Sequence, residues 1–139
     1  MHWRPPDDRT VRHAQYKETA LKFALLVLKA PFQHQASASA LAFARASLDQ
    51  GHQLVRVFFY EEGVQNANRL AAPSAPDTNL VHLWSNLASE QGVDLVVCAS
   101  AGLRRGLREA NLAPGFRISG LGQLIEATII ADRLVTFGG

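Results

Sequence analysis

The chain of 139 residues contains a single cysteine, so it cannot form an internal disulfide bond. Its longest mainly apolar runs are residues 23–28 and 93–99, far short of the roughly 18 apolar residues of a membrane-spanning helix. Residues 1–20 carry several charges and no apolar segment, which argues against a secretory signal. One reduced thiol and no signal are typical of the cytoplasm, where we expect the protein to work.

The chain also has little excess of positive over negative charge. The formal net charge of +2 is too small to indicate nucleic-acid binding by itself, so no direct nucleic-acid binding is expected. The one basic cluster is typical of a solvated face and comprises Arg104, Arg105, Arg108 and Arg117. The five histidines lack metal-site spacing, and Gly115, Gly120 and Gly122 do not form a dinucleotide fingerprint. We therefore expect no metal ion and no cofactor.

The chain divides into two parts at residue 20. Residues 1–20 contain Pro5, Pro6 and several charges without a sustained hydrophobic period, which predicts a flexible N-terminal extension. Residues 21–139 alternate apolar runs with helical periods and are long enough for one domain. Strands are predicted for the following runs: Phe23–Leu28, Leu54–Tyr60, Val93–Cys98 and Leu134–Phe137, with a brief one at Arg117–Ile118.

Segments with the hydrophobic periodicity of a helix separate these strands. Apolar residues from Ala40 to Leu48 predict a helix that ends at Gly51. A second helix is expected from a cap at Asp77 or Thr78 to Gly92. A short helical stretch should cover residues 99–110, and Ser119 should cap the last helix. Residues 61–76 are expected to form a long connection.

Strands that alternate with helices predict the α/β class. The expected architecture is a single domain with an open, mainly parallel sheet and helices on both of its faces. In such sheets the reactive site lies beyond the carboxyl ends of the strands. Three segments should meet there: residues 29–35, residues 60–76 and the turn after Cys98.

Cys98 is the candidate reactive residue. It ends a predicted strand and precedes a predicted helix, whose free N–H groups and dipole favour a thiolate. Arg104 and Arg105 would add positive potential if their side chains fold back. A buried structural cysteine is the competing interpretation, since free cysteine is among the most buried residue types.

Three kinds of thiol chemistry are conceivable for Cys98. A cysteine hydrolase needs a base, and His34 lies on a segment of the same edge, although a solvent-facing histidine is the simpler interpretation. Redox exchange usually requires a second cysteine, which the chain lacks. A thiol that receives and releases sulfur needs no partner of its own, so the composition favours a sulfur carrier.

Three blocks resemble one known family. They are residues 58–68 (FFYEEGVQNAN), residues 97–106 (VCASAGLRRG) and residues 118–124 (ISGLGQL), followed by Asp132–Val135. In register, these blocks are similar to the TusD branch of the DsrE/DsrF-like sulfurtransferases. The resemblance extends from Leu21 to the end of the chain and implies a DsrE-like doubly wound fold.

The resemblance also implies a role. It implies that Cys98 accepts sulfur as a persulfide from a TusA-like donor and passes it to a TusE-like acceptor. TusB-like and TusC-like subunits would complete a hetero-oligomer that serves the synthesis of 2-thiouridine at the tRNA wobble position. Two alternatives remain: a DsrE-like protein of sulfur oxidation, and a non-catalytic assembly subunit whose cysteine is buried.

Two departures from the family pattern affect these expectations. Family chains typically begin just before the first strand, where this chain has Leu21 and Lys22. Residues 1–20 are therefore expected to be additional sequence. The segment between Gly106 and Phe116 is shorter than the family pattern, which bears on access to the thiol or on a subunit contact.

Overall fold

The computed structural model describes residues 19–32, 34–71 and 79–139. The predicted flexible extension over residues 1–20 thus falls almost entirely outside the described residues. The elements follow one another in this order: β1 (Lys22–Val27), α2 (Gln35–Asp49), β2 (Gln53–Phe59), η1 (Glu61–Ala67), α3 (Leu80–Gln91), β3 (Leu95–Cys98), α4 (Ala99–Arg104), η3 (Glu109–Asn111), β4 (Phe116–Ser119), α5 (Gly122–Ile130) and β5 (Arg133–Phe137).

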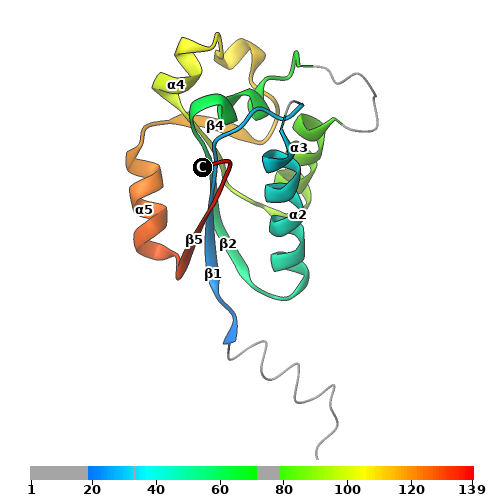
Figure 1. The fold of residues 1–139 in the computed structure, drawn as a ribbon, viewed down its shortest axis with the longest axis vertical. Coiled ribbons are helices and arrows are strands. Elements are labelled where there is room, and N and C mark those ends of the chain that lie inside the picture. Colours follow the sequence, from blue (N-terminus) through cyan, green and yellow to red (C-terminus); the bar gives the residue numbers. More distant parts are fainter. Residues whose placement is uncertain (1–18, 33, 72–78) are drawn as a thin grey trace, which may run out of the picture.

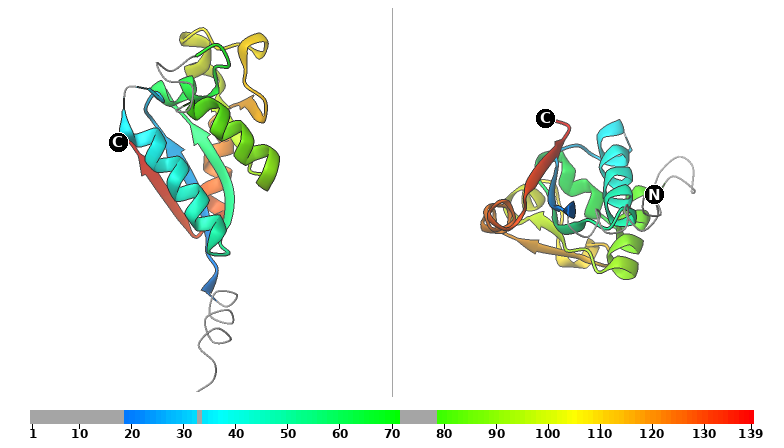
Figure 2. Two further views of the ribbon diagram at one scale, coloured as in Figure 1. Left: turned by 90° about the vertical axis from the view of Figure 1, so that its right-hand side faces the viewer. Right: turned by 90° about the horizontal axis from the view of Figure 1, so that it is seen from below.

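The five strands form one sheet in the order β4-β3-β2-β1-β5, and every neighbouring pair is parallel. Helices α2 and α3 cover one face of the sheet and α5 covers the other, as Figure 1 shows. The two helices of the first face lie side by side (Figure 2). The predicted α/β class, with a parallel sheet between helices, is confirmed.

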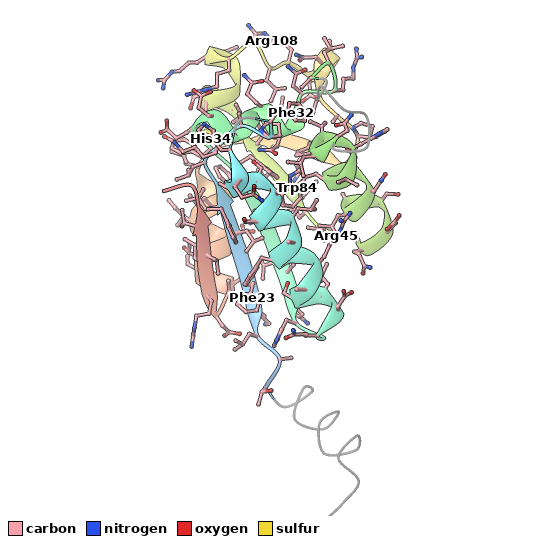
Figure 3. The ribbon with its side chains drawn as sticks, turned by 45° about the vertical axis from the view of Figure 1, so that its right-hand side comes forward. Phe23, Phe32, His34, Arg45, Trp84 and Arg108 are labelled. Atoms are coloured by element: carbon pink, nitrogen blue, oxygen red, sulfur yellow. The ribbon has the colours of Figure 1, made fainter. Side chains whose placement is uncertain are left out.

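The main core lies between the sheet and the pair α2 and α3. Side chains alternate along each strand, so Val27, Phe59 and Val97, which are neighbours in the ladder, point to this same face. The ring of Phe59 meets Trp84 of α3 edge-on, with centroids 5.2 Å apart. Trp84 lies between its helix and the sheet in Figure 3 and is fully buried. This apolar contact packs α3 on the sheet, and the parallel pairing of the strands places their carboxyl ends at one edge.

The helix ends follow local chemistry, with one correction. Gly51 after α2 and Gly92 after α3 have φ of 86° and 68°, a conformation that glycine adopts without steric cost. The N-cap of α3 is Asn79, whose side chain accepts a hydrogen bond from the His82 N–H at 3.2 Å. The predicted caps Asp77 and Thr78 lie outside the described residues, and the prediction that one of them caps α3 is wrong.

The predicted connection over residues 61–76 contains a helix. Its first part is the 3-10 helix η1, which packs against the end of β1. A Cβ atom on Gly63 would lie 2.0 Å from the Val27 carbonyl oxygen, so only glycine permits this approach. The Tyr60 N–H donates to the same carbonyl at 3.0 Å. Residues 72–78 of the connection are outside the described part.

The last helix starts later than predicted. Ser119 is the final residue of β4, where it pairs with Cys98, and is therefore not a cap. The N-cap of α5 is Leu121, and it makes no side-chain capping hydrogen bond. The stretch predicted to be helical over residues 99–110 is interrupted by a turn at Gly106, with a φ of 77°, and continues as η3.

Candidate functional site

Cys98 is positioned by the junction of β3 and α4. It is the last residue of β3, and the backbone at this position, with φ of −63° and ψ of 123°, makes it the N-cap of α4. The four residues of β3 are all buried, which fixes the strand and its final residue in the core. The sulfur thus lies at the carboxyl edge of the sheet, next to the first N–H groups of a helix.

The ladder defines which face of the sheet Cys98 occupies. Val96 pairs with Arg117, and Cys98 pairs with Ser119 two residues later in both strands. Since alternate residues share a face, Cys98 lies on the face that Arg117 occupies, which is the face covered by α5. The core packing of Phe59 and Trp84 is on the opposite face.

The thiol is covered and has one polar contact. Cys98 is only 1% exposed, whereas the next two residues, Ala99 and Ser100, are exposed. Cys98 Sγ lies 3.4 Å from Ser100 Oγ, and either atom can act as the donor. If the sulfur is a thiolate, the hydroxyl of Ser100 must donate. Ser100 stands in the sequence block that contains Cys98, but the sequence analysis did not assign it a role.

At the carboxyl edge of the sheet, Asn66 joins η1 to the segment after β1 and to α2, a role that was not predicted from the sequence. Asn66 is fully buried in η1 and its Nδ2 donates to the Lys29 carbonyl at 3.1 Å, to Ser37 Oγ at 3.1 Å and to the Gly63 carbonyl at 2.9 Å. These acceptors come from three of the segments that surround the carboxyl edge. An asparagine between buried apolar neighbours, Val64 and Ala67, was the available signal.

The two arginines proposed to stabilise the thiolate take different positions. Arg105 Nε donates to Glu62 Oε1 at 3.1 Å, and its Nη1 donates to the Ala101 carbonyl at 3.1 Å. Its Nη2 is 3.9 Å from Glu61 Oε2, so this charge is shared with two carboxylates of η1. Arg104 is exposed in the last turn of α4. Neither guanidinium is among the recorded hydrogen-bond partners of Cys98 in the described residues.

The histidine considered for a hydrolase site is exposed. His34 is the N-cap residue of α2, with no side-chain capping hydrogen bond. Figure 3 shows it at the start of α2, toward the same end of the molecule as Phe32 and Arg108. Within the described ranges, the hydrogen-bond partner recorded for Cys98 is Ser100 rather than His34. A nucleophile–base pair between Cys98 and His34 therefore has no contact in this structure to support it.

At the end of β3 opposite the thiol, charged side chains hold α5 to the sheet. Asp94 accepts from Arg56 Nε at 2.7 Å and from Arg117 Nε at 2.8 Å. Arg56, which is almost fully buried in β2, also donates to the Gln123 carbonyl at 2.8 Å and to Glu126 Oε1 at 3.2 Å. Burial alone would raise the pKa of Asp94, but the hydrogen bonds and charges of Arg117 and Arg56 outweigh it and lower that pKa.

The described ranges contain neither a metal-ligand cluster nor a membrane-spanning helix. Among residues 19–32, 34–71 and 79–139, no three side chains of His, Cys, Asp or Glu are grouped so that they could hold a metal ion. In the same ranges no helix has the length and apolar character needed to cross a bilayer.

Comparison with protein-family models assigns the chain to a known group. The model of the DsrE/DsrF-like family matches residues 21–137, which is most of the chain. The chain belongs to the DsrE/DsrF-like family. The resemblance inferred from the sequence blocks is thereby confirmed.

Relatives within the DsrE/DsrF-like family are close. The chain is 49% identical over 129 residues to a protein of Allochromatium vinosum that carries the name sulfurtransferase DsrE, covering 85% of this chain and 99% of the relative. It is 48% identical over 130 residues to the sulfurtransferase TusD of Yersinia pestis, covering 86% and 99% of the two chains. Among solved structures, the ychN protein from E. coli has the same fold, with a TM-score of 0.75 at 24% identity over 84% and 99% of the two chains.

The segment between Gly106 and Phe116 is expected from its sequence to be shorter than the family pattern. In the structure it lies against the end of η1 and the residues that follow it. Arg69 donates twice to the Ala110 carbonyl, at 3.0 and 2.8 Å, and the Ala113 N–H donates to the Ala67 carbonyl at 2.7 Å. The segment therefore helps to fix η1 at the carboxyl edge of the sheet.

Proposed function

We propose that this DsrE/DsrF-like protein is a sulfurtransferase that carries sulfur on Cys98 as a persulfide. The observation that carries the proposal is the position of the chain's single thiol. Cys98 ends a buried strand at the carboxyl edge of the sheet and caps a helix. The close relatives DsrE and TusD, both named sulfurtransferases, support this chemistry.

The proposed transfer needs no oxidant and no cofactor. The Cys98 thiolate attacks the outer sulfur of a donor persulfide, a new S–S bond forms, and the donor leaves as a thiolate. The outer sulfur is then bound as Cys98–S–SH. In the second step an acceptor thiolate attacks that outer sulfur, which regenerates the Cys98 thiolate. The number of S–S bonds is unchanged in each step, so the second cysteine of a redox protein is not required.

The local structure supplies groups for this chemistry. The first turn of α4 presents unpaired backbone N–H groups near the sulfur, and Ser100 Oγ lies 3.4 Å away as a hydrogen-bond donor for an anion. Because Cys98 is 1% exposed, a donor can reach the sulfur only when the residues that cover it move aside. The burial limits access by solvent and would protect a persulfide from hydrolysis and reduction.

The wider pathway is a proposal that rests on the TusD relatives. A TusA-like protein would donate the sulfur, TusB-like and TusC-like subunits would form a hetero-oligomer with the chain, and a TusE-like protein would accept the sulfur for wobble 2-thiouridine synthesis. A second candidate is sulfur trafficking in sulfur oxidation, which the resemblance to DsrE implies; the DsrE relative is 49% identical to the chain and the TusD relative 48%. A non-catalytic assembly subunit is the third interpretation, and the burial of Cys98 favours it.

Mass spectrometry of the intact protein tests the persulfide. Purified protein is incubated with a cysteine desulfurase, its substrate cysteine and a TusA-like carrier. A mass increase of one sulfur atom that dithiothreitol removes is expected. The Cys98→Ser variant should show no increase, and His34→Ala, a matched change at the exposed histidine, should behave like wild type. A wild-type protein that stays unmodified, while the carrier is loaded, would leave only the assembly role.

A second measurement separates the two pathways. Persulfide-loaded protein is mixed with either a TusE-like acceptor or a thiol acceptor protein from a sulfur-oxidising bacterium, and sulfur on each acceptor is followed over time. Faster transfer to the TusE-like protein supports the tRNA role. Faster transfer to the other acceptor would assign the chain to sulfur oxidation and leave the role of Cys98 intact.

A further inference from the structure

The buried thiol meets a side chain that is open to solvent. Cys98 Sγ lies 3.4 Å from Ser100 Oγ, and Ser100 is exposed although Cys98 is only 1% exposed. The hydroxyl therefore has contact both with the sulfur and with the surface. A serine hydroxyl has one donor and two acceptor sites and can rotate, so it can accept from a thiol and donate to a thiolate.

Other polar groups close to the sulfur are not recorded as its hydrogen-bond partners. Cys98 is the N-cap of α4 but makes no side-chain capping hydrogen bond, so its sulfur does not accept from the first N–H groups of this helix. Arg105 instead donates to Glu62 and to the Ala101 carbonyl. Within the part of the chain that the structure describes, the recorded partner of the sulfur is the Ser100 hydroxyl. A buried anion is costly without hydrogen bonds, so a thiolate here depends on this contact.

The charge on Cys98 Sγ changes in opposite directions in the two halves of the proposed transfer. During loading, the thiolate gives an electron pair to the new S–S bond and loses charge. During release, an acceptor attacks the outer sulfur, the bond between Sγ and that sulfur breaks, and its electron pair stays on Sγ. A hydroxyl that donates to Sγ therefore binds it more strongly in the transition state of release, and less strongly in that of loading.

We propose that Ser100 is a catalytic residue of this transfer, whose hydroxyl stabilises the Cys98 thiolate as it leaves the persulfide. The inference rests on the proposed function and adds to it a residue that favours release. The O–H of Ser100 donates to Sγ as the S–S bond breaks and keeps its own proton. A thiolate that is stabilised in this way is the better leaving group.

The rate of sulfur release tests this role. Protein loaded by a TusA-like carrier is separated from it and treated with cyanide, which takes the outer sulfur as thiocyanate and leaves the Cys98 thiolate. Ser100→Ala should slow this release roughly 3- to 10-fold, because part of a hydrogen bond to a developing charge is lost. Ser100→Thr keeps a hydroxyl and should restore nearly the wild-type rate. Ser89→Ala, at an exposed serine of α3, is the matched control and should leave the rate unchanged.

The rate of loading separates this role from a structural one. It is measured with the same carrier over a range of pH, up to values at which the rate no longer rises and both proteins react as thiolates. There Ser100→Ala should load as fast as wild type or up to about twofold faster, because a thiolate without this hydrogen bond is the stronger nucleophile. At lower pH the variant should load more slowly, since fewer of its thiols are ionised. A substitution that merely displaced α4 would slow loading and release alike at every pH.

The outcomes distinguish the role of Ser100 from the proposed function. A wild-type protein that takes up no sulfur while the carrier is loaded would overturn both. If wild type is loaded and Ser100→Ala releases sulfur at the same rate, only the role of Ser100 is overturned. Equal slowing of loading and release at every pH would also overturn it. Alanine is a good helix former, so the variant should fold, and far-UV circular dichroism checks this.

Discussion

The substitution Asp94→Asn tests the charged contacts that hold α5 to the sheet. Asp94 accepts from Arg56 at 2.7 Å and from Arg117 at 2.8 and 2.9 Å. An asparagine keeps the shape of the side chain but presents no negative charge to the two guanidinium groups. Because the side chain of Arg56 is only 10% exposed, its charge cannot be compensated fully by water.

The expected decrease in the free energy of unfolding follows from the number and the exposure of these hydrogen bonds. A hydrogen bond to a charged group contributes about 1.5–3 kcal/mol net, and Asp94 accepts several that reinforce one another. Its side chain is 31% exposed, and Arg56 keeps its bonds to Gln123 and Glu126, so the loss should stay near 2–3 kcal/mol. For a domain of this size, that lowers Tm by roughly 6–10 °C.

The pH dependence gives the prediction a second readout. The pKa of Asp94 is lowered in the folded protein because Arg117 and Arg56 outweigh the effect of burial. The unfolded state therefore binds protons more readily, and the stabilisation is present above the unfolded pKa of about 3.9 and lost as the pH falls through the folded pKa. The gap between wild type and Asp94→Asn should be constant from neutral pH to about pH 5 and close in more acidic solution.

Urea unfolding followed by far-UV circular dichroism measures this gap across the pH range. Asp49→Asn is the matched control, because Asp49 is exposed at the end of α2 and its replacement should cost less than about 0.5 kcal/mol. Equal midpoints for wild type and Asp94→Asn at neutral pH would refute the reasoning. A gap that widens toward acid would refute it as well, since it has the opposite sign.

Two further predictions concern the carboxyl edge of the sheet. Gly63→Ala should lower the free energy of unfolding by more than about 3 kcal/mol, because its Cβ would lie 2.0 Å from the Val27 carbonyl oxygen. Gly120→Ala is the control: its Cβ would meet open space, so the decrease should be less than about 1 kcal/mol. Thermal unfolding of both variants checks this. Asn66→Asp should destabilise more at neutral than at acid pH, because a buried carboxylate would face the carbonyl oxygens of Lys29 and Gly63; a urea midpoint that is independent of pH would contradict it.

Much of the fold could be predicted because strands and helices leave strong local patterns. The buried runs of β1, β2 and β3 and the glycine after α2 were visible in the sequence. The 3-10 helix η1 was not, because it depends on the close approach of Gly63 to Val27, two segments distant in the chain. Ser119 was mistaken for a cap because a serine at the end of a strand and one before a helix look alike in sequence.

The same limit applies to the candidate site. The place of Cys98 at the end of a strand and the start of a helix follows from local sequence alone, and the structure has it there. The position of Arg105 does not follow, since it depends on Glu61 and Glu62 of η1, which meet α4 only in the fold. Burial of the thiol likewise results from long-range packing. The position of Cys98 within its secondary-structure elements was therefore predictable, whereas the partners of each charge were not.

The thiol lies on the same face of the sheet as the charged contacts of α5, but the two are at opposite ends of β3. Asp94 directly precedes β3, and Cys98 ends it, so the length of the strand separates them. The recorded hydrogen bonds of Asp94 go to Arg56 and Arg117, and that of Cys98 goes to Ser100. Loss of the hydrogen bonds of Asp94 should lower the temperature at which the protein unfolds. Persulfide formation well below that temperature should not change. If Asp94→Asn abolished persulfide formation in the folded protein, α5 would itself shape the thiol site.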